Sequence, residues 1–131
     1  MTATEEIRLT LPAERDFFRV AHLVLGGLAV RLNLTFESLE DLQLALDGLL
    51  EREPGDGDVT VCVSVGRGVL ETLVGPFDDA DTLRAELERD PGDDMTLRRL
   101  LDTVVDDVAL EDREDGKWVR VTKRVERLEG R

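Results

Sequence analysis

The chain has 131 residues, of which 41% are apolar, the size and composition of one domain with one hydrophobic core. Its formal net charge of −13 repels phosphate backbones and anionic lipid heads, so nucleic acids and membranes are not expected partners. No run approaches the roughly 20 apolar residues that cross a bilayer, and the N-terminus lacks the pattern of a signal peptide. We therefore expect a single cytoplasmic domain over residues 1–131.

Three residues with chemically versatile side chains occur once each. Cys62 lies within an apolar run, which favours a small buried hydrophobe over a reactive thiol, and a lone cysteine excludes disulfides and cysteine-rich metal sites. His22 has no second histidine or cysteine beside it, so we expect a packed or partly exposed helix residue rather than a metal ligand or base. Trp118 is typical of core or edge packing, with a partner-contact anchor as the alternative.

The N-terminal third of the chain predicts a strand followed by a long helix. Apolar and polar residues alternate over residues 7–11, which is the period of a half-buried strand, and Pro12 ends it. From about Ala13 to Leu32 the apolar residues recur at steps of three and four, which lines one face of a helix. Gly26-Gly27 weakens that helix and indicates close approach by a neighbouring backbone.

A second helix and a hairpin are predicted next. Ser38 with Asp41 three residues later resembles a capping box, and an apolar stripe continues to about Glu51. Valines alternate with polar residues over residues 59–65, and a glycine-containing turn leads to a returning strand over residues 69–74. We expect Gly75-Pro76 to stop that strand.

The remaining elements complete a two-layer architecture. Short helices are predicted over residues 81–89 and 94–107, followed by strands over residues 109–113 and 117–125 that flank the turn dipeptide Asp115-Gly116. Strands and helices segregate in a way that suits an α+β two-layer sandwich, in which a mostly antiparallel sheet is covered on one face by helices. The basic residues near the C-terminus, Arg120, Lys123, Arg124 and Arg127, are expected to balance nearby acids on a solvated strand face.

Three stretches taken together resemble the anti-sigma-factor serine kinases of bacteria, which belong to the histidine-kinase-like ATPase superfamily. They are residues 11–13 with the end of the following helix at 29–34, residues 40–46, and the closing strand at 119–124. The likeness spans residues 7–125, and the order of elements agrees with that read from the periodicity. The resemblance therefore implies the histidine-kinase-like ATPase fold.

In that family, the second helix carries an acid that serves as base and an asparagine that holds magnesium. The matching positions here are Gly48 and Arg52. Glycine supplies no base, and a guanidinium has no lone pair for magnesium and repels the ion. A shift of one residue would offer Asp47 and Glu51 instead, but it rotates the helix by about 100° and would take the apolar stripe off the core.

The family's two other nucleotide motifs are also altered. The acid that receives the adenine amino group is missing from residues 72–77, where only Gly75 is kept. The glycine-rich phosphate lid falls on residues 90–95, where aspartates would repel a triphosphate. The resemblance thus implies a degenerate member with no catalytic residue and no cofactor.

The expected function is that of a non-catalytic anti-sigma-factor-like protein, which binds protein partners in a bacterial partner-switching circuit. The resemblance implies a sigma factor or an anti-sigma antagonist as partner, and a homodimer that pairs through the first strand and first helix. Two alternatives stay open. One is a divergent serine/threonine kinase that binds ATP and magnesium through replaced residues, and the other is a pseudo-domain that pairs with an active paralogue.

Adjacent phenylalanines on the first helix offer a candidate for the partner-binding surface. Residues next to each other on a helix lie about 100° apart, so Phe17 and Phe18 cannot both face the core. We expect Phe18 to be the partly exposed apolar anchor, with Arg15 among the charged residues around it.

Overall fold

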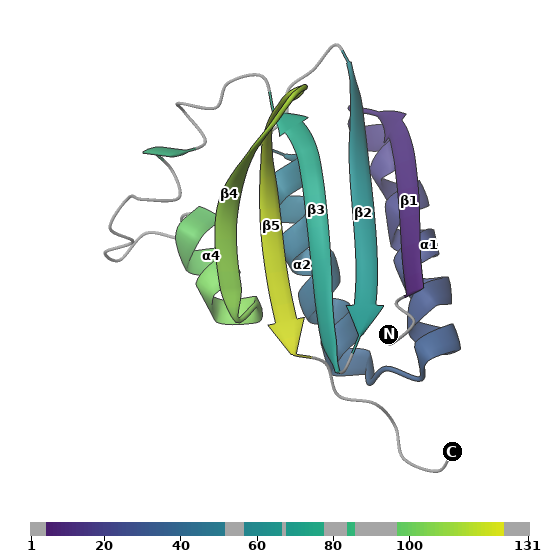
Figure 1. Cartoon of the computed structure of the whole chain (residues 1–131). Coiled ribbons are helices and arrows are strands. Elements are labelled where there is room, and N and C mark those ends of the chain that lie inside the picture. The colour runs from purple at the N-terminus through teal and green to yellow at the C-terminus, as the bar shows by residue number, and fades with distance from the viewer. Residues whose placement is uncertain (1–4, 52–56, 67, 78–83, 86–96, 125–131) are drawn as a thin grey trace.

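The computed structural model describes residues 5–51, 57–66, 68–77, 84–85 and 97–124. Five strands form one sheet in the order β1-β2-β3-β5-β4, and every neighbouring pair is antiparallel. Helices α1 and α2 lie behind this sheet in Figure 1, while the other face of the sheet looks toward the viewer. The α+β two-layer fold expected from the sequence is confirmed.

The strands β1 (Glu5–Pro12), β2 (Asp58–Gly66) and β3 (Val69–Phe77) form one side of the sheet. The four valines of β2, at positions 59, 61, 63 and 65, are all buried, because alternate residues of a strand point to the same face. The opposite alternation, which includes Arg8, Cys62 and Leu73, points away from the helices.

Strand β3 does not stop at Gly75-Pro76 as expected, but continues to Phe77. Proline has no amide hydrogen to donate to a neighbouring strand. The pairing of β3 with β5 is accordingly irregular between Val74 and Phe77, where the register shifts. A local irregularity of this kind lets a strand pass through a proline instead of ending there.

The first helix begins later than its apolar periodicity predicts. A short 3-10 turn, η1 (Arg15–Phe17), precedes α1 (Phe18–Leu32), so the expected start at Ala13 is wrong. The amide of Ala13 donates to the carbonyl of Gly57 at 3.0 Å, which holds this residue in a loop contact instead of a helix. The helix ends at Leu32 and is capped by Asn33, which has a φ of 59°, a left-handed conformation that asparagine tolerates better than most residues.

The second helix, α2 (Phe36–Leu50), begins before the expected Ser38. Its cap is Thr35, whose hydroxyl accepts a hydrogen bond from the amide of Ser38 at 3.2 Å. Asp41 plays no part in capping, because it pairs with Lys123. The proposed capping box is therefore wrong, although the helix itself is confirmed.

The C-terminal elements are α4 (Leu97–Val104), β4 (Asp107–Arg113) and β5 (Gly116–Arg124). Most of the expected helix over residues 81–89 lies outside the described residues, and residues 84–85 are helical. The helix expected to reach residue 107 ends at Val104, and Asp107 already belongs to β4. Arg113 pairs with Gly116, so the turn residues are Glu114 and Asp115, one position earlier than expected.

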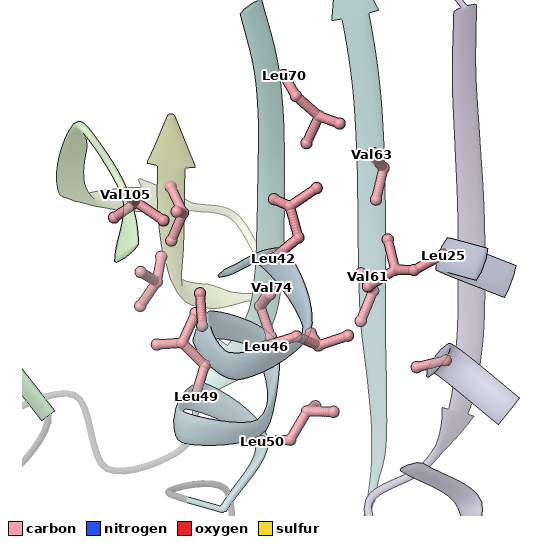
Figure 2. Close-up of a cluster of buried hydrophobic side chains, with 14 of the residues drawn as sticks. Leu25, Leu42, Leu46, Leu49, Leu50, Val61, Val63, Leu70, Val74 and Val105 are labelled. Carbon is pink, nitrogen blue, oxygen red and sulfur yellow. The ribbon is translucent and has the colours of Figure 1, made fainter. Parts of the chain in front are cut away.

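The core lies between the sheet and the helices, where leucines of α2 meet valines of β2 and β3 (Figure 2). Leu46, Leu49 and Leu50 are each at most 2% exposed, which confirms the predicted apolar stripe of this helix. None of the helices in the described part is long and apolar enough to cross a membrane. The described residues also contain no cluster of three or more histidine, cysteine or acidic side chains that could hold a metal.

Candidate functional site

The family's base position, Gly48, lies in the last turn of α2 and is buried. It has no side chain to accept a proton, so no base stands at this position. Arg52, at the magnesium-ligand position, and residues 90–95, at the lid, lie outside the described residues.

Asp47, the first acid of the shifted register, is hydrogen-bonded to α1. Oδ1 of Asp47 lies 2.6 Å from Nε2 of His22, a hydrogen bond that ties α2 to α1. Both side chains are roughly one-third exposed, at 38% and 36%. Leu46 and Leu49 remain in the core, as the apolar stripe of this helix predicts, and Asp47 lies beside them at the surface of α2. His22 is thus a partly exposed helix residue, as expected.

Residues 72–77 are used for packing within the sheet. Thr72 is buried, and its hydroxyl has no hydrogen-bond partner within the described structure. A Cβ atom added at Gly75 would lie 2.7 Å from Cδ2 of Trp118, far inside normal contact. The one glycine kept from the family's adenine motif is therefore required by the indole ring beside it. Trp118 is buried, as its packing interpretation predicts.

The space between the helices and the sheet is filled. A hollow of about 10 Å³ remains there, which is room for one water molecule at most. Pockets for small molecules usually measure several hundred cubic ångströms, so this hollow is too small for a nucleotide. The residues around the hollow are Leu25, Leu42, Ala45, Leu46, Leu49, Thr72 and Val121.

The outward face of α1 is unusually apolar. Leu23 and Val30 are 75% and 82% exposed, and Val20 is 40% exposed. These residues, with Gly27, follow one another at helical spacing and form what we call the α1 stripe. A Cβ atom at Gly26 or Gly27 would meet nothing within 4 Å, so the close approach of a neighbouring backbone expected at these two glycines is wrong within the described structure.

A hollow of about 370 Å³ continues the α1 stripe at the corner between α1 and α2. Val30 and Phe36 lie on its walls, and the side chain of Phe36 is 72% exposed. Its remaining lining residues are Gly26, Ala29, Asn33, Leu34, Thr35 and Leu39. Large exposed apolar side chains grouped around a hollow are typical of a protein-binding surface.

One of the two adjacent phenylalanines is exposed and the other faces the core, as expected, but the exposed residue is Phe17 and not Phe18. Phe18 is partly buried and packs against the core, whereas Phe17 is 39% exposed. The 3-10 turn before α1 sets this orientation, and the expectation that Phe18 is the exposed anchor is wrong. Arg15 is exposed, and its role in partner binding stays a prediction.

Two of the C-terminal basic residues, Arg120 and Lys123, pair with acids as predicted, but Lys123 is only 13% exposed, so the expected solvated face is wrong for this residue. Arg120 pairs with Glu111 on the outer face of the sheet. Lys123 donates to Oδ2 of Asp41 and to the carbonyl of Val104, both at 3.0 Å, and joins β5 to α2 and α4. Arg127 lies outside the described residues.

Cys62 is 6% exposed and behaves as a buried hydrophobe, which confirms the sequence interpretation. Burial, reinforced by the neighbouring charge of Glu6, raises the pKa of its thiol. The thiol therefore stays protonated and weakly nucleophilic near neutral pH.

Comparisons with known proteins identify what the chain resembles. No family model matches it. It is 29% identical to the serine-protein kinase RsbW of Listeria monocytogenes, over 83% of this chain and 81% of the relative, and 22% identical to that of Bacillus mycoides, over 97% and 89%. A crystal structure of the RsbU and RsbW domains of a Mycobacterium tuberculosis protein superimposes with a TM-score of 0.67 at 15% identity, over 94% of this chain and 32% of that longer one.

Proposed function

We propose that this RsbW-like chain, an anti-sigma-factor serine kinase-like domain with the histidine-kinase-like ATPase fold, is a non-catalytic regulatory protein that acts by binding other proteins. It would serve in a bacterial partner-switching circuit in the cytoplasm. The observation that carries the proposal is the exposed apolar surface of the α1 stripe and the adjoining hollow.

The exposure of this surface has an energetic consequence. Burying a leucine or valine side chain at an interface contributes about 1.5 to 3 kcal/mol, so Leu23 and Val30 together can hold a protein partner. Leaving them in water has no benefit for folding, since neither side chain packs on the core. A partner surface therefore accounts for their positions.

The loss of catalysis is supported by two described positions. Gly48 offers no base, and residues 72–77 offer no acid for adenine while their glycine accommodates Trp118. The net charge of −13 adds a long-range field that speeds encounter with basic partners. A sigma factor or an anti-sigma antagonist is the partner class we propose.

We also propose a homodimer. Among the described strands, β1 pairs with β2 on one side only and forms an edge of the sheet. Edge strands of this kind can pair with a second chain. Light scattering at tens of micromolar should report twice the monomer mass, and a monomer at that concentration would contradict the dimer.

The experiment that tests the binding surface compares two variants. Leu23→Ser combined with Val30→Ser removes the stripe without opening the core, whereas Asp102→Ser changes an exposed residue of α4 as a matched control. Pull-down with purified sigma factors and antagonists of the native organism should fail for the first variant and succeed for the second. Equal capture by both would contradict the proposed surface.

A divergent serine/threonine kinase is the second candidate, and it is favoured by the likeness to the serine-protein kinases RsbW of Listeria monocytogenes and Bacillus mycoides. It would bind ATP and magnesium and phosphorylate a protein partner. Transfer of labelled phosphate from ATP to an antagonist protein, dependent on this chain, would establish it. We expect no transfer.

A further inference from the structure

The spacing of the α1 stripe is that of a coiled-coil seam. Its members Val20, Leu23, Gly27 and Val30 are all exposed, and they follow one another at steps of three, four and three residues. Alternating steps of three and four are the repeat with which one helix packs its side chains between those of another. An extended strand presents every second residue and does not match this spacing. The periodicity therefore favours a helix as the occupant of the stripe.

Gly26 and Gly27 lie in the middle of this seam and have no packing role inside the described structure. A Cβ atom at either position would meet nothing within 4 Å. Glycine is the least favourable residue in a helix interior apart from proline, so the pair weakens α1 without a gain in internal packing. Because glycine has no side chain, it lets another backbone approach closely. The pair is thus the point at which a second helix can come nearest to α1.

The hollow of about 370 Å³ extends the same surface beyond the seam. Gly26 and Val30 of α1 lie on its walls, together with Phe36 and Leu39 of α2. An apolar side chain of a helix that follows the stripe would enter this hollow after passing Val30. The seam from Val20 to Val30 is about 15 Å long at a rise of about 1.5 Å per residue, so three turns of a partner helix cover it.

The charge of α1 is opposite in sign to that of the whole chain. From Phe18 to Leu32 the helix has two arginines, one histidine and no acidic residue, although the chain has 30 acids and a net charge of −13. Arg31 is exposed next to Val30 at the end of the seam. Charges beside the seam of a helix pair determine which partner is chosen. The stripe therefore complements a helix that is acidic beside its apolar residues.

We propose that the α1 stripe binds an amphipathic helix of a protein partner. This helix crosses α1 at Gly26 and Gly27, carries acidic residues beside its apolar seam and places an apolar side chain in the hollow. The inference rests on the proposed function, whose binding surface it uses, and it adds the kind of structure that binds there. The partner as a whole can still be basic, because only the docking helix meets α1.

The test measures the fluorescence anisotropy of fluorescein-labelled peptides titrated with the full chain. The probe is Glu-Leu-Ala-Gln-Leu-Glu-Ala-Glu-Leu-Ala-Gln-Leu-Glu-Ala, in which leucines form the seam and glutamates lie beside it. A neutral peptide has glutamine in place of every glutamate, and a proline peptide has proline in place of the two central alanines.

We expect saturable binding of the probe and at least ten-fold weaker binding of the proline peptide, which cannot form a continuous helix. The neutral peptide should bind about three-fold more weakly than the probe, since exposed charge pairs contribute modestly. Nonspecific attraction cannot produce this order, because the net charge of −13 repels the acidic probe.

Gly27→Gln fills the crossing point without a change of charge. A side chain there has open space, so the variant should keep the fold and have at least wild-type stability in urea denaturation. Its affinity for the probe should fall at least ten-fold. Thr103→Gln, at an exposed position of α4, is the matched control and should bind the probe as the wild-type chain does.

Four results would overturn the proposal. Three of them are equal binding of the probe and the proline peptide, equal binding of the probe and the neutral peptide, and unchanged affinity of the Gly27→Gln variant for the probe. The fourth is conversion of a dimer into a monomer by Gly27→Gln in light scattering, which would show that a second copy of the chain covers the stripe.

Failure of this inference is distinguishable from failure of the proposed function. Capture of a sigma factor or antagonist that depends on Leu23 and Val30, together with equal binding of the probe and the proline peptide, would keep the function and exclude the helix. Equal capture by the Leu23→Ser, Val30→Ser variant and its control would contradict the function, and with it the docking helix.

Discussion

The position for a Cβ atom at Gly75 lies 2.7 Å from Cδ2 and 2.8 Å from Cγ of Trp118. The indole of Trp118 on β5 therefore occupies the space that a side chain at Gly75 on β3 would need. A glycine at this place in the chain also matches the family's adenine motif. The structure gives it a role in packing that needs no nucleotide.

Gly75→Ala should displace Trp118 and cost about 1 to 3 kcal/mol of unfolding free energy, as overpacking typically does. The matched control is Gly27→Ala in α1, where a methyl group meets nothing and alanine favours the helix by about 1 kcal/mol. Urea denaturation with tryptophan fluorescence measures both effects. A Gly75→Ala protein with wild-type emission and stability would contradict the assigned packing.

The two phenylalanines before α1 provide a second prediction. Phe18→Ala should lower the unfolding free energy by about 2 kcal/mol, because this side chain packs on the core. Phe17→Ala, at a 39% exposed position, should leave stability within about 0.5 kcal/mol. Thermal denaturation of both variants is the measurement. If Phe17→Ala lowered the unfolding free energy more than Phe18→Ala, Phe17 and not Phe18 would be the residue that packs on the core.

The bond between Lys123 and Asp41 joins the last strand to the second helix, and only 13% of the lysine side chain is exposed. Lys123→Met should cost about 2 kcal/mol, since it leaves the carboxylate without its partner and the Val104 carbonyl without its donor. The exposed pair Arg98–Asp102 is the control, and Asp102→Ala should cost about 0.5 kcal/mol or less. Denaturant titration measures the unfolding free energy of both variants. Similar decreases in Lys123→Met and Asp102→Ala would contradict a special role for the Lys123–Asp41 pair.

How far the sequence determined these features depends on the range of the interactions involved. Alternation of valines on β2 and the leucine stripe of α2 are local patterns, and they predicted the sheet and the core directly. Thr35 as helix cap and Ala13 outside the helix depend on single hydrogen bonds, one of them to the distant Gly57, which periodicity does not show.

The candidate sites were harder to predict because they depend on contacts between distant segments. The need for Gly75 arises from a residue 43 positions later, and the orientation of Phe18 depends on a 3-10 turn that the helical pattern conceals. The α1 stripe contains apolar residues that the periodicity assigned to the core, such as Val20. Only the packed structure separates an apolar residue that faces the sheet from one that faces solvent.

Burial determines the behaviour of the lone thiol. The raised pKa of Cys62 predicts that iodoacetamide at pH 8 reacts at least ten-fold more slowly with the folded than with the unfolded chain. The pKa of Cys62 is higher in the folded than in the unfolded chain. Its contribution to the free energy of unfolding is therefore fully present at pH values below the unfolded-state pKa, and it is lost as the pH rises through the folded-state pKa. Cys62→Val should remove this alkaline loss. Equal alkylation rates in the two states would contradict the burial.

Isothermal titration calorimetry of the full chain with ATP and ADP, in the presence of magnesium, tests the central claim of a non-catalytic protein most directly. The account predicts no measurable binding at millimolar nucleotide, because residues 72–77 supply no acceptor for adenine and the guanidinium of Arg52 has no lone pair for magnesium. Gly48→Glu with Arg52→Asn should not restore binding or hydrolysis, since the adenine acceptor is still missing. Micromolar affinity of the wild-type chain for ATP would contradict the claim.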